Sequence, residues 1–290
     1  MNGVIVAGTD GSAVADEAVC WAVDDAARRG APLRIVHAVE AWPYGASGFS
    51  ASGTADFAVR AGERMLTEAA RAAADRRPDA VVTTELVEGA PAAVLRDQAT
   101  AAAELVVGSH GVSAVTGALL GSVPAGVAGH VDGAVVVVRP SMADPYGGIV
   151  VGVGDSEECE PALAFAFEQA RLRGCPLRAV HARRTPSRVS EPGPDRTEDE
   201  APRAVADRLA AWRERFPTVA VTQDMACAPP AAALVDASGR AALLVVGSRG
   251  LGAVGSLILG SVSRQVLHHA RCPVAVVRQA PLRSSPAGHR

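Results

Sequence analysis

The chain has 290 residues, of which 49% are hydrophobic, 3% aromatic and 20% charged, and its net charge is −3. This length suits two ordinary globular domains with largely aliphatic cores. The near balance of 28 basic and 31 acidic residues lacks the excess of positive charge that a nucleic-acid-binding face requires, so we expect no nucleic-acid partner.

The first half begins with the apolar run 4–7 (VIVA), typical of a strand buried on both faces of a parallel sheet. A helix follows, because apolar residues recur at helical spacing through 15–26 and the run 28–30 (RRG) supplies terminal cations and a glycine. The remaining expected elements are a strand at 33–39, a loop at 40–54, a helix at 56–77, a strand at 80–86, a helix from 91 to about 102, a strand at 105–108, a helix at about 122–130 and a strand at 134–139.

The same order restarts after a linker at 140–148. The segment 148–155 repeats 3–10, with an offset of 145 (155 − 10), and the later glycine loop repeats with an offset of 139 (247 − 108), so the second half is shorter near its second helix. Strands that alternate with helices predict βαβ units and a parallel sheet in each half. We expect two tandem α/β domains, 1–140 and 147–279.

Each half carries a glycine-rich stretch after its fourth strand. The stretch 106–111 (VVGSHG) is followed after nine residues by Gly121-Ser122, and the stretch 245–250 (VVGSRG) is followed after nine residues by Gly260-Ser261. Free N–H groups at a helix N-terminus favour an anion, and glycine lacks the Cβ that would keep a phosphate from the backbone. We interpret both stretches as phosphate-binding loops.

This spacing resembles the nucleotide-binding signature of the universal stress protein family, Gly-x2-Gly-x9-Gly-Ser/Thr, and the resemblance covers roughly 1–140 and 147–279. It implies two Rossmann-like domains, each an open five-stranded parallel sheet flanked by helices, whose fifth strands pair in an intramolecular pseudo-dimer. It further implies ATP with Mg²⁺ as ligand, a nucleotide-dependent role in the cellular stress response with little turnover, and a homodimer or intrachain pseudo-dimer.

The resemblance places the phosphates and their metal near Asp10 and Asp155, and the adenine near the ends of the second strands. The expected nucleotide-binding residues are Asp10, Ala38, Val39, Gly108, Ser109, His110, Gly111, Gly121, Ser122 and Val123 in the first half, and Asp155, Ala182, Gly247, Ser248, Arg249, Gly250, Gly260, Ser261 and Val262 in the second.

Several of these residues have an alternative structural interpretation. Asp10 has the position of an N-cap for the first helix, and Ser122 and Ser261 are expected to cap the helices that they begin. Arg249 either reaches a phosphate or points into solvent. The second half departs from the pattern at Ser156-Glu157, so we expect both sites to bind nucleotide with unequal affinity.

Other functions remain open at this stage. A weak ATPase or self-phosphorylating enzyme is the main alternative, with Ser122 or Ser261 as acceptor, although neither loop carries the lysine of a P-loop. A structural pseudo-dimer that acts through protein partners is another. His37 and His181 have no matched nucleophile, so we expect buried structural histidines.

The cysteines and the apolar runs predict the compartment. The five cysteines form no Cys-x-x-Cys pair, no apolar run approaches the roughly 20 residues of a membrane span, and no secretory segment precedes Val4. We therefore expect a cytoplasmic protein without a membrane partner, whose cysteines are mostly small core residues.

Overall fold

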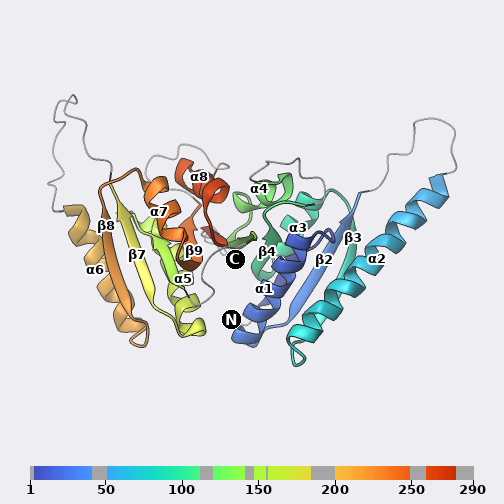
Figure 1. Ribbon diagram of the computed structural model, residues 1–290, viewed down its shortest axis with the longest axis horizontal. Helices are drawn as coiled ribbons and strands as arrows, with labels where there is room; N and C mark the ends of the chain where they lie inside the picture. The colour runs from blue at the N-terminus through green and yellow to red at the C-terminus, as the bar shows by residue number, and fades with distance from the viewer. Residues whose placement is uncertain are drawn as a thin grey trace, which may run out of the picture.

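The computed structural model describes residues 3–40, 51–111, 120–140, 147–154, 156–183, 200–248 and 259–278. These residues form two α/β halves that share one ten-stranded sheet (Figure 1). We refer to residues 3–140 as half one and to residues 147–278 as half two. No helix within the described ranges is long and apolar enough to cross a membrane.

Half one alternates strands and helices as its sequence predicts. Its strands are β1 (Val4–Gly8), β2 (Leu33–Val39), β3 (Val82–Glu88), β4 (Ala102–Gly108) and β5 (Gly133–Val138). Its helices are α1 (Ala13–Arg29), α2 (Ala51–Arg76), α3 (Pro91–Ala99) and α4 (Ser122–Ala128).

Half two repeats this order, with one 3₁₀ turn added before its first helix. Its strands are β6 (Gly148–Gly152), β7 (Leu177–Ala182), β8 (Val221–Ala226), β9 (Ala241–Gly247) and β10 (Val274–Arg278). Its helical segments are η1 (Glu157–Cys159), α5 (Glu160–Arg173), α6 (Glu200–Arg215), α7 (Pro230–Ser238) and α8 (Ser261–His269).

The largest differences between predicted and observed helix boundaries in half one are at the start of α2 and the end of α3. Helix α2 begins at Ala51, inside the segment 40–54 that was expected to be a loop because glycine and serine are weak helix formers. Of that segment, 41–50 lies outside the described residues. Helix α3 ends at Ala99, not near residue 102, because Ala102 already pairs with β1 in the sheet.

The strand order is β3-β2-β1-β4-β5-β10-β9-β6-β7-β8. Among the described strands, every pair within a half is parallel, and only β5 and β10 pair in the antiparallel sense. This confirms the predicted pair of open five-stranded parallel sheets joined through their fifth strands. In each half the chain reverses its winding direction between the first and fourth strands, which is where open α/β sheets bind ligands.

The helices form two layers that cover the two faces of the sheet (Figure 1). Helices α1, α2, α5 and α6 pack on one face, and α3, α4, α7 and α8 pack on the other. The two cores are mainly aliphatic, as the composition predicts. The helical stripe on α1 is fully inside, since every apolar residue of its 15–26 repeat is at most 4% exposed.

The two halves are related by an approximate twofold axis that passes between β5 and β10. Val136 stands opposite Ala275 in the antiparallel ladder, and the two are counterparts in the repeat at an offset of 139 (275 − 136). Both side chains are fully buried. Pairing of β5 with β10 removes the exposed edge that each five-stranded sheet would otherwise present.

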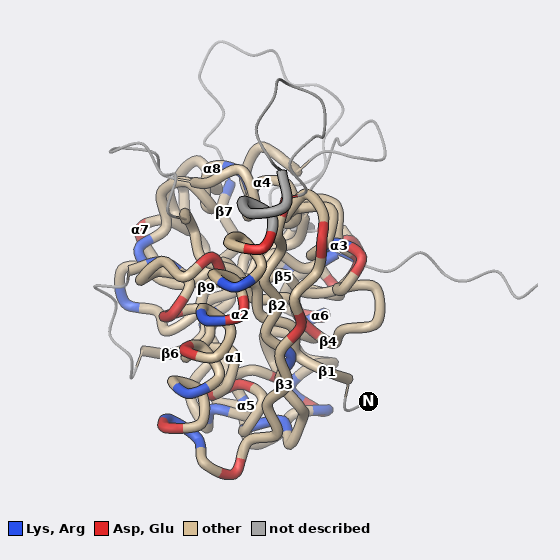
Figure 2. Tube along the Cα trace, turned by 90° about the vertical axis from the view of Figure 1, so that its right-hand side faces the viewer, with Lys and Arg blue, Asp and Glu red and all other residues tan. Residues whose placement is uncertain are grey.

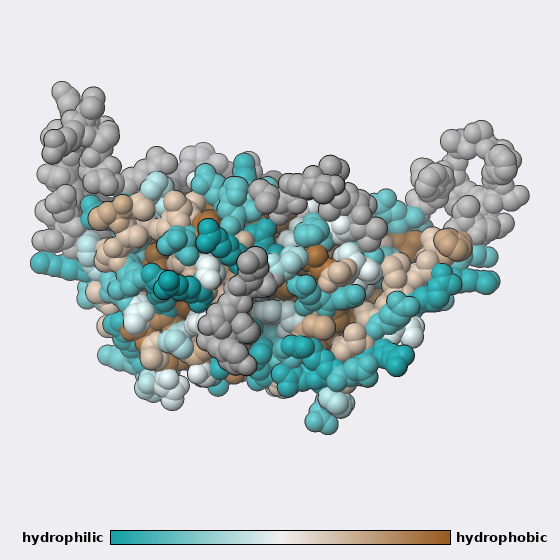
Figure 3. Space-filling view, in the orientation of Figure 1, coloured by the Kyte–Doolittle hydropathy of each residue, from teal (hydrophilic) through white to brown (hydrophobic). Residues whose placement is uncertain are grey.

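The surface carries both signs of charge. Basic and acidic positions are interspersed along the described chain in the view of Figure 2, and hydrophilic residues lie among smaller apolar ones in Figure 3. The large apolar side chains that are exposed among the described residues are Phe57, Val59, Val81 and Met225. They lie on α2 and on or beside the outer strands β3 and β8, away from the junction of the two halves.

Candidate functional site

The site in half one forms where β1 and β4 end side by side. These neighbouring parallel strands end at the same edge of the sheet, so the residues after Gly8 and after Gly108 meet there. The segment after β1 contains Asp10, and the segment after β4 contains Gly111. The tertiary structure therefore brings together residues that lie a hundred positions apart in sequence.

The carboxylate of Asp10 lies directly against Gly111. A Cβ atom placed on Gly111 would overlap Asp10 Oδ2, so only glycine leaves room for this carboxylate. The φ of Gly111 is not in the left-handed region, so close approach is what the structure requires of this glycine. Gly108 has a different role, because a Cβ there would lie 3.2 Å from the carbonyl carbon and oxygen of Val14 at the start of α1.

Ser12, not Asp10, is the N-cap of α1. Its Oγ accepts a hydrogen bond from Ala15 N at 3.2 Å, whereas Asp10 Oδ1 accepts from Ser12 N at 3.1 Å within the turn. The alternative interpretation of Asp10 as the helix cap is therefore wrong. Its other carboxylate oxygen faces the glycine loop.

The base of each glycine loop is closed by a matching hydrogen bond. Gly121 N donates to Ser109 O at 2.8 Å in half one, and Gly260 N donates to Ser248 O at 2.9 Å in half two. Ser109 and Ser248 are only 1% and 6% exposed, so these serines hold the loop ends together from within the fold. The Ser109 hydroxyl lies 3.0 Å from His110 Nδ1.

The helices after the loops begin without a side-chain cap. Gly121 and Gly260 are the N-caps of α4 and α8, and neither helix has a side-chain cap hydrogen bond. The expectation that Ser122 and Ser261 cap these helices is wrong, because glycines hold the cap positions and both serines are already the first helical residue, where they are exposed. Val123 and Val262 follow in the first turn, half-buried.

Ala38 and Ala182 turn their peptide groups toward the strand-end crevices. Thr9 N donates to Val36 O on the β1 side of β2, and successive residues of a strand address opposite neighbours, so Ala38 faces that side just beyond the end of β1. The carbonyl of Val39 faces β3, where it accepts from Gly89 N at 2.9 Å. In half two, Val153 N donates to Val180 O, which places Ala182 equivalently.

His37 and His181 hold the strand ends together. His37 Nδ1 lies 2.8 Å from Thr9 O, and His181 Nδ1 lies 2.9 Å from Val153 O. Both therefore have the structural role that the sequence predicts, although only His181 is buried and His37 remains half-buried. Thr9 was missed by the sequence analysis, yet it is buried and its Oγ1 accepts from Gly11 N at 3.2 Å.

A family model described as "Universal stress protein family" matches residues 1–139 and 145–278. A universal stress protein of Mycobacterium tuberculosis is 38% identical over 301 residues, spanning 96% of this chain and 98% of the relative. A second from that organism is 36% identical over 288 residues, spanning 95% and 96%.

This chain belongs to the universal stress protein family. A crystal structure of a universal stress protein from Archaeoglobus fulgidus shares its fold, with a TM-score of 0.72 at 21% identity over 97% of this chain and 100% of that one. The family membership rests on both halves, because the family model matches each of them.

The second site of this universal stress protein is described only in part. Asp155, Arg249 and Gly250 lie outside the described residues, so their predicted roles stay predictions. Gly247 ends β9 as Gly108 ends β4, and Gly260 is the N-cap of α8 as Gly121 is of α4.

The start of α5 differs from that of α1 in this family member. Cys159 in η1 donates to Ser156 O at 3.1 Å, and burial raises the pKa of this thiol despite the nearby Arg208. Arg208, which the sequence analysis missed, donates from α6 to Gly154 O at 3.0 Å and pairs with Glu160 at 2.7 Å. A guanidinium group thus lies beside the end of β6.

A cavity of about 340 Å³ opens between α5 and α6. Its lining residues are Glu160, Ala204, Arg208, Ala211, Trp212 and Arg215. None of them was predicted to bind nucleotide, and Arg208 connects this cavity to the end of β6 through its hydrogen bond to Gly154 O.

Proposed function

We propose that the protein binds ATP with Mg²⁺ at the strand-end crevice of each domain, 1–140 and 147–279. The observation that carries this proposal is the contact of Asp10 with Gly111 at the point where the neighbouring strands β1 and β4 end. A carboxylate beside a glycine loop suits a phosphate bridged by a cation, because the cation cancels the repulsion between two anions.

The residues of the crevice fit a nucleotide with bound metal. Asp10 would hold Mg²⁺, which when bound would neutralise the charge of the triphosphate. The uncapped helix starts after Gly121 and Gly260 offer N–H groups to phosphate oxygens. Ala38 and Ala182 would offer peptide groups to the adenine edge. They are better candidates for adenine binding than Val39, whose carbonyl already accepts a hydrogen bond from Gly89 N.

We infer a regulator that responds to nucleotide with little turnover. Phosphoryl transfer relies on charge stabilisation and an oriented nucleophile, and the printed sequence contains no lysine to act at the phosphates. Nδ1 of His37 lies 2.8 Å from the Thr9 carbonyl, so this nitrogen has a structural role. The family membership supports a role in the stress response, and the five unpaired cysteines suit the reducing cytoplasm.

Titration calorimetry tests the proposed ligand. Mg-ATP should bind at two sites per chain, with the half-one site tighter, and ADP and cAMP serve as comparison ligands. Replacing Asp10 with alanine should weaken the half-one site about ten- to a hundredfold, the effect of losing a charged contact of about 1.5–3 kcal/mol. Asp224→Ala on the surface of β8 is the matched control. Absence of nucleotide binding by the folded protein would contradict the proposal.

Self-phosphorylation is the alternative that a specific observation favours. Ser122 and Ser261 are exposed at the first position of their helices, where a bound phosphate would be near. Mass spectrometry after incubation with Mg-ATP, together with phosphate release, separates the two functions. A regulator should stay unmodified and release phosphate well below the roughly 1 s⁻¹ that marks the slow end of ordinary enzymes.

A further inference from the structure

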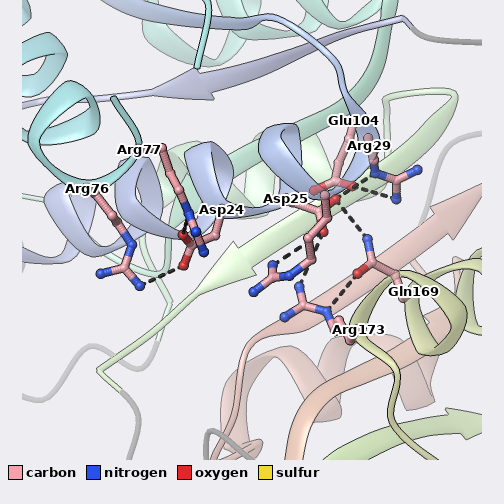
Figure 4. Close-up of polar contacts among 9 residues, drawn as sticks. Asp24, Asp25, Arg29, Arg76, Arg77, Glu104, Gln169 and Arg173 are labelled. Carbon is pink, nitrogen blue, oxygen red and sulfur yellow. Dashed lines mark hydrogen bonds and ion pairs between the residues drawn. The ribbon is translucent and has the colours of Figure 1, made fainter. Parts of the chain in front are cut away.

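A buried polar cluster lies between α1 and α5, where the two halves meet (Figure 4). Asp25 on α1 and Gln169 on α5 are both fully buried, and Gln169 Nε2 donates to Asp25 Oδ2 at 2.9 Å. Arg29 Nε donates to the same carboxylate at 2.6 Å, and Arg173 Nη2 reaches it at 3.4 Å from the other half. One carboxylate is thus shared by groups from both halves.

The members of this cluster are counterparts of one another in the repeat. Arg173 corresponds to Arg29 at an offset of 144 (173 − 29), and the same offset relates Gln169 to Asp25 (169 − 25). The twofold axis therefore sets Asp25 opposite the position that is its own counterpart. The two halves carry different residues at this position, an acid in one and an amide in the other.

Each of the two arginines packs over an aromatic ring of the other half. The guanidinium of Arg29 lies 5.6 Å from the ring centre of Phe165 in half two, and that of Arg173 lies 5.1 Å from the ring centre of Trp21 in half one. Phe165 and Trp21 are again counterparts at an offset of 144 (165 − 21). Both halves thus supply one arginine and one aromatic ring, whereas only half one supplies the buried acid.

A second acid in half one makes this difference larger. Glu104 on β4 is 1% exposed and lies 3.5 Å from Arg29, and its counterpart at an offset of 139 is Leu243 (243 − 104). Burial and then the charge of Asp25 raise the pKa of Glu104 well above its usual range. Arg28 of α1 also lies 3.9 Å from Asp25, so half one supplies both acids and two of the three arginines around them.

Pairing of either half with a second copy of itself would lose the hydrogen bond between Gln169 and Asp25. Two copies of half one would bury two Asp25 carboxylates face to face, along with two Glu104 side chains. Two copies of half two would bury two Arg173 guanidinium groups, with Gln169 and Leu243 offering no carboxylate. An uncompensated buried charge is strongly destabilising.

An ion pair at the rim of the junction disfavours the pairing of half two with itself. Arg278 of β10 lies 3.3 Å from Asp132 of half one, and it donates to Gly129 O at 3.0 Å. The counterpart of Asp132 in half two is Arg271, at an offset of 139 (271 − 132). Two copies of half two would therefore bring Arg278 against another arginine.

We propose that this cluster makes the two halves select each other, so that half one accepts half two and a second copy of either half is a poorer partner. The junction is then a recognition surface whose partner is the complementary half. The linker keeps that partner at a high local concentration, and the cluster adds chemical selectivity to this proximity.

The test uses four positions in the full-length chain and measures the equilibrium constant for unfolding in denaturant. Gln169→Asp with Leu243→Glu gives both halves the acidic set, and Asp25→Gln with Glu104→Leu gives both halves the neutral set. Each double variant should raise the unfolding constant about a hundred- to a thousandfold. The quadruple variant exchanges the two sets and restores one acidic half beside one neutral half, so it should return to within about tenfold of the original protein.

The quadruple variant shows whether stability depends on pairing an acidic half with a neutral half or only on how well each side chain fits its position. If the effects of the two double variants add, or if either double variant is as stable as the original protein, the proposal is wrong. Should a double variant fail to fold, the single variant Gln169→Asp is compared with the double variant Asp25→Gln/Gln169→Asp. If the second change recovers stability, selection is supported. If it lowers stability further, the proposal is wrong. Asp75→Asn, in an exposed ion pair with Arg71 on α2, is the control and should change the constant only a few-fold.

Discussion

The carboxylate of Asp10 fills the space that a side chain at position 111 would need, although the two residues lie 101 positions apart (111 − 10). Only the pairing of β1 with β4 brings them together. This contact links the glycine loop to the acid beside it, so the two should be tested as a unit.

Gly111→Ala should destabilise half one by about 1–3 kcal/mol, because its Cβ would overlap Asp10 Oδ2 and overpacking has that cost. Asp10→Ala in the same chain should relieve most of that loss, since the overlap is gone. Denaturant unfolding of both single variants and the double gives the coupling energy. If Gly111→Ala costs the same with and without Asp10, the contact is not the reason for the glycine.

Substitutions at Ser12 and at Asp10 should have different effects, on stability in the first case and on nucleotide affinity in the second. Ser12→Ala removes the N-cap of α1 and should cost about 1 kcal/mol of unfolding free energy while leaving nucleotide affinity nearly unchanged. Asp10→Asn keeps the size of the side chain and should weaken Mg-ATP with little change in stability. Thermal unfolding and calorimetry on both variants check this contrast, and the reverse pattern would assign Asp10 a structural role.

Glu104 should make the free energy of unfolding fall as the pH rises. Its pKa is raised above the usual 4.5 by burial and by Asp25, while Arg29 and Arg173 oppose the shift. A raised folded-state pKa means that the folded protein holds this proton more tightly than the unfolded chain. The resulting stabilisation is complete below about pH 4.5 and is lost as the pH rises through the raised pKa.

Glu104→Gln should remove the fall of unfolding free energy with rising pH, because the amide does not titrate.

Asp24→Asn is the matched control, because the pKa of Asp24 is shifted in the opposite direction. Burial alone would raise the pKa of Asp24, but hydrogen bonds from Arg76 and Arg77 outweigh it and lower this pKa below the usual 3.8. Asp24 therefore contributes stability that is lost as the pH falls, and Asp24→Asn should flatten only the acid limb. Chemical unfolding from pH 3 to pH 9, roughly the span of both effects, measures the two limbs.

The cysteines should differ strongly in reactivity. Cys272 is fully buried, and burial raises its pKa to about 12, so very little thiolate forms at neutral pH. Cys227 is exposed. Alkylation of the folded protein, followed by peptide mass spectrometry, should label Cys227 first and leave Cys272 unmodified until the chain unfolds. Early labelling of Cys272 would show that β10 opens locally.

Local patterns in the sequence determined most of the secondary structure and the duplication. The apolar runs mark the buried strands, and the helical spacing through 15–26 marks the inward face of α1, because the periods of strands and helices follow from backbone geometry. The paired glycine loops followed from the repeat in the same way. The alternation of strands and helices therefore predicted the parallel sheets, and the glycine spacing carried the resemblance to the family.

Contacts between distant residues were decided only by the tertiary structure. The sequence did not show that Ser12, and not Asp10, caps α1, nor that the hydroxyls of Ser122 and Ser261 leave their helices uncapped. Asp25 lies beside the apolar stripe of α1, and the sequence analysis did not single it out. Its burial against Gln169 depends on where β5 and β10 pair, and the energy of a charge depends on its surroundings, which residue spacing along one chain does not specify.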